Sequence, residues 1–361
     1  MNTNFFDYTL EPGKELNKDN KYEDSKPIIS VVTPFYNSIK YIRQTVYSIL
    51  NQTFPCFELL IIDDGSKDSS GKICDEYAHA HKNFYAYHKK NTGLGLTRNY
   101  GLNLIKGDYV TFVDSDDYLD KNAISHLIAG LNDGKNDTVI GGFTKITDSG
   151  KRLYVEKYPS KTIKKDAIYN KLFVKMLGSA PGRHDSIRPS VWNTLYSVDI
   201  IKKNNLKFVS ERELISEDIV WDSAYYRYCK SVQIISIATY YYRFNPNSLS
   251  HTYRADRFHQ SIYFFEYMLN RLSSFSIYNE AKERLSKNLF INVRASISQE
   301  KYNSLKKRYS HIKSMCNDVV LAKAIAEYPI NRLGKSQMFF ILMIKYKMTG
   351  MLTILSKLGV I

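Results

Sequence analysis

Short apolar runs alternate with helical stretches over the first third of the chain. Residues 28–32 and 58–62 are apolar runs typical of buried parallel strands. Between them, apolar residues recur every three or four positions and so share one face of a helix; they are Ile39, Ile42, Val46, Ile49 and Leu50. A strand, a helix and a second strand in this order predict a βαβ unit.

The alternation continues to about residue 143. Apolar spacing predicts helices over 66–81 and 96–106. Further strands are predicted over 84–88, 109–113 and 138–143. Repeated βα units predict an α/β fold with a mostly parallel sheet flanked by helices.

The remaining chain divides into three kinds of segment. Residues 150–190 lack periodicity and are predicted to be loops, whereas 191–253 form a second ordered stretch. From residue 257 the spacing is helical. We therefore predict a polar leader over 1–26, a catalytic domain over 27–253 and a C-terminal helical region over 254–361, which agrees with the length of 361 residues.

Polar clusters follow the predicted strands at the points where these end. They are Thr33 to Asn37, Asp63 with Asp64, Asn91 to Gly95, and Asp114 to Asp117. In an open α/β sheet, ligands bind outside the carboxyl ends of the strands. We therefore expect one binding site that collects these clusters.

The acidic run Asp114-Ser115-Asp116-Asp117 is the first candidate for chemistry. Carboxylates held close together repel one another, and a hard divalent cation such as Mg²⁺ or Mn²⁺ relieves that repulsion. Such an ion uses few protein ligands when a diphosphate completes its shell. The alternative is a solvated turn that places acidic residues at the start of a helix.

The other clusters suit a nucleotide. Thr33 to Asn37 offer a hydroxyl, an amide and an aromatic face on which a base can stack. Asp63 or Asp64 can accept the N3–H of uracil, or can instead form an Asx turn. Arg98 is placed to face a phosphate, although a helical arginine can equally be solvated or paired with an acid.

Five ordered blocks between Ile28 and Leu119 carry a resemblance. They read VVTPFYN, SILNQTF, FELLIIDDGSKDSS, NTGLGLTRNYGL and GDYVTFVDSDDYL. This run resembles glycosyltransferase family 2, whose members have the GT-A fold. The resemblance implies an inverting transfer from a nucleotide-diphospho-sugar with the help of Mn²⁺ or Mg²⁺.

The resemblance also assigns residues. Asp116, with Asp114, would bind the metal. The nucleotide-sugar would be bound by Thr33, Pro34, Tyr36, Asn37, Asp63, Asp64, Asn91, Arg98, Asp114 and Ser115. The base that deprotonates the acceptor would be Asp218 in ISEDIVW, with Glu217 beside it; the alternative is an acidic pair that stabilises a helix N-terminus.

Weaker candidates for acceptor or diphosphate contacts lie downstream. They are Trp192, Asn193, Arg243 and His251. VWNTLYS matches the family only partly, because Thr194 stands where relatives commonly have a lysine. The QxxRW signature of processive family members is absent. The resemblance therefore implies the addition of a single sugar.

Net charge and cysteine spacing limit the kinds of ligand and the cellular compartment that we expect for this protein. The formal charge is +15, which attracts polyanions, anionic lipids or phosphorylated substrates. The four cysteines are far apart and predict neither a zinc site nor a disulfide framework. Residues 1–26 lack the apolar run of a signal peptide, and no apolar stretch is long enough to span a bilayer. We expect a cytoplasmic protein.

The C-terminal end is cationic and amphipathic. No acidic residue follows Tyr328, while lysines and arginines interleave with apolar residues. Such a segment can lie on an anionic membrane, here the inner face of the cell membrane, or can pack its apolar face on the catalytic domain or on a partner subunit. A membrane position would suit a lipid-linked glycan acceptor of a bacterial capsule or exopolysaccharide, and homo-oligomerisation stays open.

Three other function classes compete with the transferase. A non-catalytic nucleotide-sugar or glycan-binding module would keep the fold without the chemistry, but both acidic groups are intact. A nucleotidyltransferase would need a phosphate loop rich in glycine and lysine, which is missing. Nucleic-acid binding has only the positive charge in its favour. A UDP-linked hexose or N-acetylhexosamine is the donor that the resemblance favours.

Overall fold

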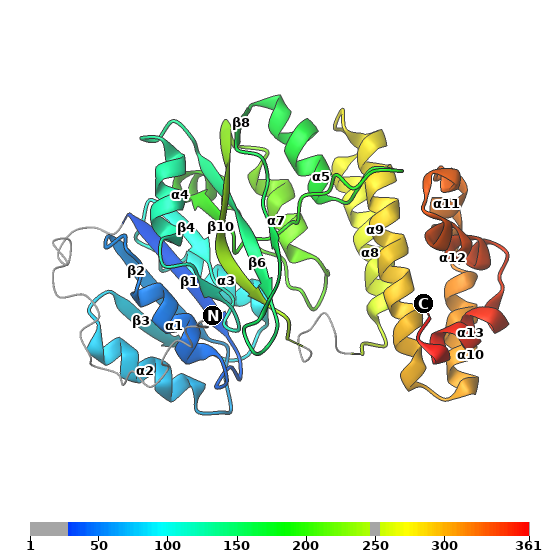
Figure 1. Cartoon of the computed structure of the whole chain (residues 1–361), viewed down its shortest axis with the longest axis horizontal. Coiled ribbons are helices and arrows are strands. Elements are labelled where there is room, and N and C mark those ends of the chain that lie inside the picture. Colours follow the sequence, from blue (N-terminus) through cyan, green and yellow to red (C-terminus); the bar gives the residue numbers. More distant parts are fainter. Residues whose placement is uncertain (1–27, 246–252, 361) are drawn as a thin grey trace. The chain divides into compact units, whose positions relative to one another are not determined.

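The computed structural model describes residues 28–245 and 253–360, which form two compact units (Figure 1). The described part of unit 1 comprises residues 28–168, 190–212 and 221–245. Unit 2 comprises 169–189, 213–220 and 253–360. Two short segments from within the predicted catalytic domain thus cluster with the C-terminal helices.

Unit 1 is built on a sheet of ten strands. Its order is β3-β2-β1-β4-β9-β6-β10-β5, with β7 paired to β6 and β8 to β10. The bounds are β1 Ile29–Phe35, β2 Phe57–Asp63, β3 Phe84–His88, β4 Tyr109–Phe112, β5 Tyr118–Leu119, β6 Thr138–Ile146, β7 Arg152–Glu156, β8 Lys161–Lys164, β9 Thr194–Ser197 and β10 Ser231–Arg243.

The first four strands are parallel, as the sequence predicts. β1 pairs in parallel with β2 on one side and with β4 on the other. Every residue of β1 and β2 is buried, which explains their continuous apolar runs. The chain runs outward from β1 to β3 and then returns to β4, so a topological switch point lies between β1 and β4. Ligands bind at such points in open α/β sheets.

Helices cover this sheet. They are α1 Ile42–Leu50, α2 Ser70–Ala80, α3 Leu94–Leu102, α4 Ala123–Leu131 and α6 Val198–Lys203. The predicted stripe on α1 is buried, with the exception of Ile39. Ile39 precedes the helix and is 49% exposed, so its inclusion in the stripe was wrong.

The stretch 150–190 is not all loop, contrary to the sequence-based prediction. It contains β7, β8, a π-helix over Ile168–Phe173 and the short α5 Val174–Met176. β7 is almost fully exposed along its length and is ordered by pairing with β6. A strand without a buried face has no alternating pattern, which is why the apolar periodicity gives no sign of it.

Unit 2 is helical apart from loops. Its helices are α8 Arg257–Leu272, α9 Tyr278–Gln299, α10 Leu305–Cys316, α11 Val319–Glu327, α12 Lys335–Lys345 and α13 Thr349–Leu358. The buried face of α13 packs on α9 and α10 of the same unit. Ile354 and Leu358 of α13 are exposed. Among the described residues, no helix is long and apolar enough to cross a bilayer.

Candidate active site

The loops after β1, β2 and β4 are tied together by hydrogen bonds. The backbone N–H of Asn37 donates to Ser66 Oγ at 2.9 Å, and the N–H of Lys67 donates to Asn37 Oδ1 at 2.8 Å. The hydroxyls of Ser38 and Ser115 are 2.7 Å apart. These bonds bring the predicted nucleoside and metal clusters to one edge of the sheet.

Tyr36 is the exposed aromatic group of this edge. Its residue surface is 46% exposed directly after β1, and Asn37 beside it has a φ of +50°. A small polar side chain tolerates that left-handed conformation. Thr33 and Pro34, in contrast, are buried within β1. The structure therefore does not expose these two residues to a nucleotide, as their predicted role requires.

The two acids after β2 have different roles. Asp63 Oδ1 accepts the N–H of Ser66 at 2.8 Å, and Asp63 Oδ2 lies 3.0 Å from His88 Nδ1. The turn alternative therefore describes Asp63. Hydrogen bonds to Asp75 and then to Asp63 raise the pKa of His88 above its usual value, although burial acts to lower it.

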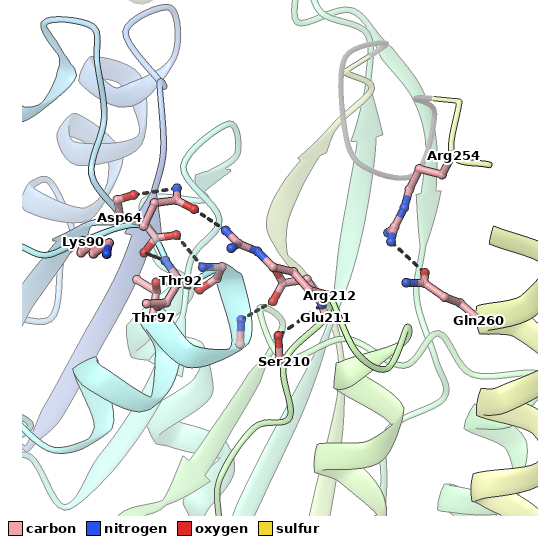
Figure 2. Close-up of polar contacts among 12 residues, drawn as sticks. Asp64, Lys90, Thr92, Thr97, Ser210, Glu211, Arg212, Arg254 and Gln260 are labelled. Atoms are coloured by element: carbon pink, nitrogen blue, oxygen red, sulfur yellow. Dashed lines mark hydrogen bonds and ion pairs between the residues drawn. The ribbon is translucent and has the colours of Figure 1, made fainter. Parts of the chain in front are cut away.

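Asp64 organises the loop that leads into α3 (Figure 2). Its carboxylate accepts hydrogen bonds from Lys89 Nζ at 2.5 Å and from the backbone N–H groups of Thr92 and Gly93 at 2.9 and 2.8 Å. Burial opposes the charge, but these donors outweigh it and the pKa of Asp64 lies below its usual value. Asp64 is therefore an ionised acceptor, and 6% of its side chain is exposed.

The N-terminus of α3 is occupied by the protein's own carboxylates. Asp64 takes the N–H groups of Thr92 and Gly93, and Glu211 Oε2 accepts the N–H of Gly95 at 3.0 Å. A helix N-terminus is a common phosphate site. Here the N–H groups of Thr92, Gly93 and Gly95 already have carboxylate partners, so a diphosphate at these groups would need another partner.

Arg98 does not supply that partner in this structure. It is 1% exposed, its Nη2 donates to Asp114 Oδ1 at 3.1 Å, and its guanidinium lies near the rings of Phe112 and Phe208. Arg98 is predicted to face a diphosphate, whereas its side chain is buried in this structure. The salt-bridge alternative describes it, and it holds Asp114 in place.

Asp114 and Asp116 remain as the candidate metal ligands. Both are half-buried after β4, and Asp116 Oδ2 accepts from Asn245 Nδ2 at 3.0 Å. Burial, and then the negative charge of Asp114, raise the pKa of Asp116. A divalent cation would relieve both effects, and Mg²⁺ typically uses one or two carboxylates plus substrate phosphates. The pair therefore fits such an ion.

Asp117 serves the fold instead. Its oxygens accept from Tyr240 Oη at 2.9 Å and from the N–H of Arg243 at 2.7 Å. Burial, followed by the charges of Asp116 and Asp114, raises the pKa of Asp117 well above its usual value. Asp117 is thus directed inward. Among the described residues there is no group of three or more acidic, histidine or cysteine side chains that could hold a metal ion.

The weaker acceptor candidates are mostly structural. The guanidinium of Arg243 donates to Asp116 O, Asp148 O and Gln44 Oε1. Trp192 is buried and stacks on Tyr240 with ring centroids 4.3 Å apart. Arg243 and Trp192 thus have structural partners here, and their predicted contacts with the acceptor or the diphosphate stay predictions.

Asn193 is likewise buried, and its Nδ2 donates to Gly141 O at 2.8 Å, so its predicted acceptor contact stays a prediction. His251 lies outside the described residues. Glu217 and Asp218 form the first turn of α7 Glu217–Tyr225 and are half-buried. They belong to unit 2, so the role of Asp218 as the base stays a prediction.

Residues 30–189 match the family model described as glycosyl transferase family 2. Over this stretch the chain is similar to glycosyltransferase family 2. Among similar proteins is EpsH of Bacillus subtilis (strain 168), which is provisionally named a glycosyltransferase. This chain is 25% identical to EpsH over 89% of its own length and 92% of EpsH. It is 28% identical to the glycosyltransferase GlyA of Streptococcus pneumoniae over 62% of this chain and 31% of GlyA.

A solved structure shares the fold of the glycosyltransferase. The crystal structure of S. aureus TarS 1-349 in complex with UDP-GlcNAc matches with a TM-score of 0.62 at 20% identity, over 92% of each chain. This likeness confirms the predicted GT-A fold with C-terminal helices. The GT-A sheet is the one described above for unit 1.

Three residues of the glycosyltransferase site carry no signal that the sequence analysis used. Asp117 stands in the acidic run, and the sequence does not indicate that it is the buried member of that run. Glu211 and Arg212 lie 116 and 121 residues from the groups that they contact, Gly95 and Asn91. Periodicity and local motifs describe neighbours along the chain, so they give no sign of such pairs.

Proposed function

We propose that this glycosyltransferase is a metal-dependent, inverting and non-processive enzyme that moves one sugar from a UDP-linked donor to an acceptor hydroxyl. The observation that carries the proposal is the convergence of Tyr36, Asp64, Asp114 and Asp116 at the switch point of the sheet, bound together by the Asn37–Ser66 and Ser38–Ser115 contacts. An aromatic face, an ionised acceptor and a pair of carboxylates correspond to the three parts of such a donor.

Tyr36 and Asp64 would recognise the nucleoside. The exposed Tyr36 ring offers a stacking surface for the base. The Asp64 carboxylate, kept ionised by its donors, accepts the N3–H of uracil at its exposed edge. The presence of UDP-GlcNAc in the TarS structure, which shares this fold, supports a UDP-linked sugar.

Asp116 and Asp114 would hold Mn²⁺ or Mg²⁺. Bound there, the ion supplies positive charge that stabilises the departing diphosphate. The chain itself keeps Asp114 oriented through Arg98 and keeps Asp116 oriented through Asn245. With the N-terminus of α3 closed by Asp64 and Glu211, the diphosphate is left to the carboxylate pair and its ion.

Asp218 would act as the base. In an inverting transfer the acceptor oxygen attacks C1 of the sugar from the side opposite the leaving phosphate, and a carboxylate removes the proton of the acceptor hydroxyl as the new bond forms. Attack from the opposite side inverts the anomeric configuration in a single displacement. Glu217 would be the neighbour that contacts the acceptor.

The acceptor would be a cell-surface glycan on a lipid carrier, reached from the cytoplasmic face of the membrane. Residues 301–360 contain 11 lysines and arginines against two acidic residues. Several large apolar side chains of the last two helices and the segments beside them are exposed: Phe339, Tyr346, Met348, Met351, Ile354 and Leu358. Exposed apolar groups among lysines favour an anionic lipid surface.

The experiment that tests the proposal is a panel of nucleotide-sugars assayed with and without Mn²⁺, by thermal stabilisation and by release of the nucleotide. A ligand that binds only the folded state raises the melting temperature with its concentration. A UDP-sugar should stabilise the protein most, and only with metal should the nucleotide be released. Stabilisation without any turnover, in the presence of candidate acceptors, would favour a non-catalytic binding module.

A further inference from the structure

The segment from Phe208 to Arg212 is held at one end against α3 and at the other against the loop that precedes this helix. At its base, Asn99 Nδ2 donates to Phe208 O and the N–H of Phe208 donates to Asn99 Oδ1, both at 2.8 Å. The Phe208 ring stacks on Trp221 with centroids 4.1 Å apart. Two hydrogen bonds between the Asn99 side chain and the Phe208 backbone, together with a buried ring, fix this end of the segment in position.

The segment then passes so close to α3 that only glycine fits there. A Cβ on Gly95 would lie 2.0 Å from Val209 O, and a Cβ on Gly93 would lie 2.3 Å from Glu211 Oε1. Gly93 also has a φ of +99°, which side chains rarely adopt. Gly93 and Gly95 of the NTGLGL block thus make room for this segment.

Glu211 and Arg212 make the polar contacts at the far end (Figure 2). Glu211 Oε2 accepts the N–H of Gly95 at 3.0 Å, where a negative charge also suits the positive end of the helix dipole. Arg212 Nη2 donates to Asn91 Oδ1, and Asn91 Nδ2 donates to Asp64 O at 2.7 Å. A chain of contacts therefore runs from Arg212 through Asn91 to Asp64.

We propose that Glu211 and Arg212 are positioning residues for donor binding, which brace the loop Asn91–Gly95 and thereby hold Asp64 in the geometry that meets the base. This inference rests on the proposed function, since it assigns the base to Asp64. Neither residue touches the reacting atoms. Their effect is on the affinity for the nucleoside part of the donor.

The two residues offer variants of different kinds. The side chain of Arg212 is 55% exposed, so Arg212→Ala should leave the melting temperature unchanged. Glu211→Ala removes the acceptor of a backbone N–H, and Glu211→Gln restores an acceptor of the same shape. Arg152→Ala, an exposed arginine on β7, is the matched control.

The test is the dissociation constant for UMP and for UDP with Mn²⁺, measured by calorimetry. Arg212→Ala should weaken both nucleotides about fivefold, which corresponds to about 1 kcal/mol. Glu211→Ala should weaken both as well, Glu211→Gln should recover most of the loss, and Asp116→Asn should weaken only UDP. A loop that is merely structural would change the melting temperature and not this pattern.

Each failure has its own signature. If wild type binds both nucleotides and Arg212→Ala binds them as tightly as Arg152→Ala does, the positioning role is wrong and the proposed function stands. If wild type binds neither UMP nor UDP, the uridine donor is wrong and the inference falls with it. A loss confined to UDP would also overturn the inference, because it would place the effect at the diphosphate.

Discussion

Replacing Asp185 with asparagine should destabilise the helical unit 2 and leave unit 1 unchanged. Arg284 of α9 is buried, and its Nη1 and Nη2 donate to Asp185 Oδ1 and Oδ2 at 3.0 and 2.9 Å. Arg284 also donates to Gly178 O and Glu280. This bidentate pair fastens the loop after α5 to the longest helix of the unit.

The magnitude follows from the pKa of Asp185. Hydrogen bonds from Arg284 outweigh burial and lower that pKa from 3.8 to about 2. The lowering corresponds to roughly 2 kcal/mol of unfolding free energy at neutral pH. Because the folded-state pKa is depressed, this contribution is present above the unfolded-state pKa and is lost as the pH falls from near 4 through about 2.

The chain provides separate probes for the two units. Both tryptophans, Trp192 and Trp221, lie in unit 1, so their fluorescence follows its unfolding. Far-UV circular dichroism is dominated by helices and so follows unit 2 strongly. In urea, Asp185→Asn should move the dichroism transition to lower denaturant and leave the fluorescence transition in place.

The control is Asp199→Asn, which breaks an exposed pair with Lys203 and should change neither transition measurably. The difference between Asp185→Asn and wild type should shrink by about half between pH 7 and pH 3. Equal dichroism transitions for Asp185→Asn and wild type at pH 7 would refute this reasoning.

Three further predictions concern packing, pH and the membrane. In Gly101→Ala the new Cβ would lie 2.5 Å from a buried valine of β1, so urea unfolding should show unit 1 destabilised by about 1–3 kcal/mol. Gly350→Ala lies in open space on α13 and should stabilise unit 2 by up to about 1 kcal/mol. Equal effects of the two variants would contradict the packing. His88 has a raised pKa, so the stability that its two carboxylate partners give is present below the unfolded value of 6.5 and lost as the pH rises through the folded value; His88→Gln should abolish this slope in the fluorescence melting temperature. Lys345→Glu with Lys357→Glu should weaken sedimentation with anionic liposomes at least tenfold, while the same change at two exposed lysines of unit 1 should not, and equal sedimentation would contradict the membrane proposal.

The parallel half of the sheet could be predicted because its signals are local. Strands such as β2 are buried on both faces and read as unbroken apolar runs, and α1 shows its stripe from Ile42 onward. β7 could not be predicted, since it has no buried face and depends on pairing with β6. The boundaries of unit 2 could not be predicted from the sequence either, because residues 169–189 and 213–220 cluster with helices that are far away along the chain.

The site was predictable in its location and less so in its details. The rule that ligands bind at the carboxyl ends of strands brought Tyr36, Asp64 and Asp116 together correctly at one edge. Burial decided the rest: Arg98 and Asp117 look like ligands in the sequence, yet they are enclosed and pair with Asp114 and with Tyr240. A motif gives residue types in order and does not say which side chains turn inward.

The central claim is that Asp114 and Asp116 bind the ion that accompanies the diphosphate. Titration of Mn²⁺ in the presence of UDP, followed by electron paramagnetic resonance, tests it most directly, with Asp199→Asn as the control. The account predicts one bound ion for each wild-type or control chain and loss of that ion in Asp116→Asn. Unchanged Mn²⁺ binding in Asp116→Asn would contradict it.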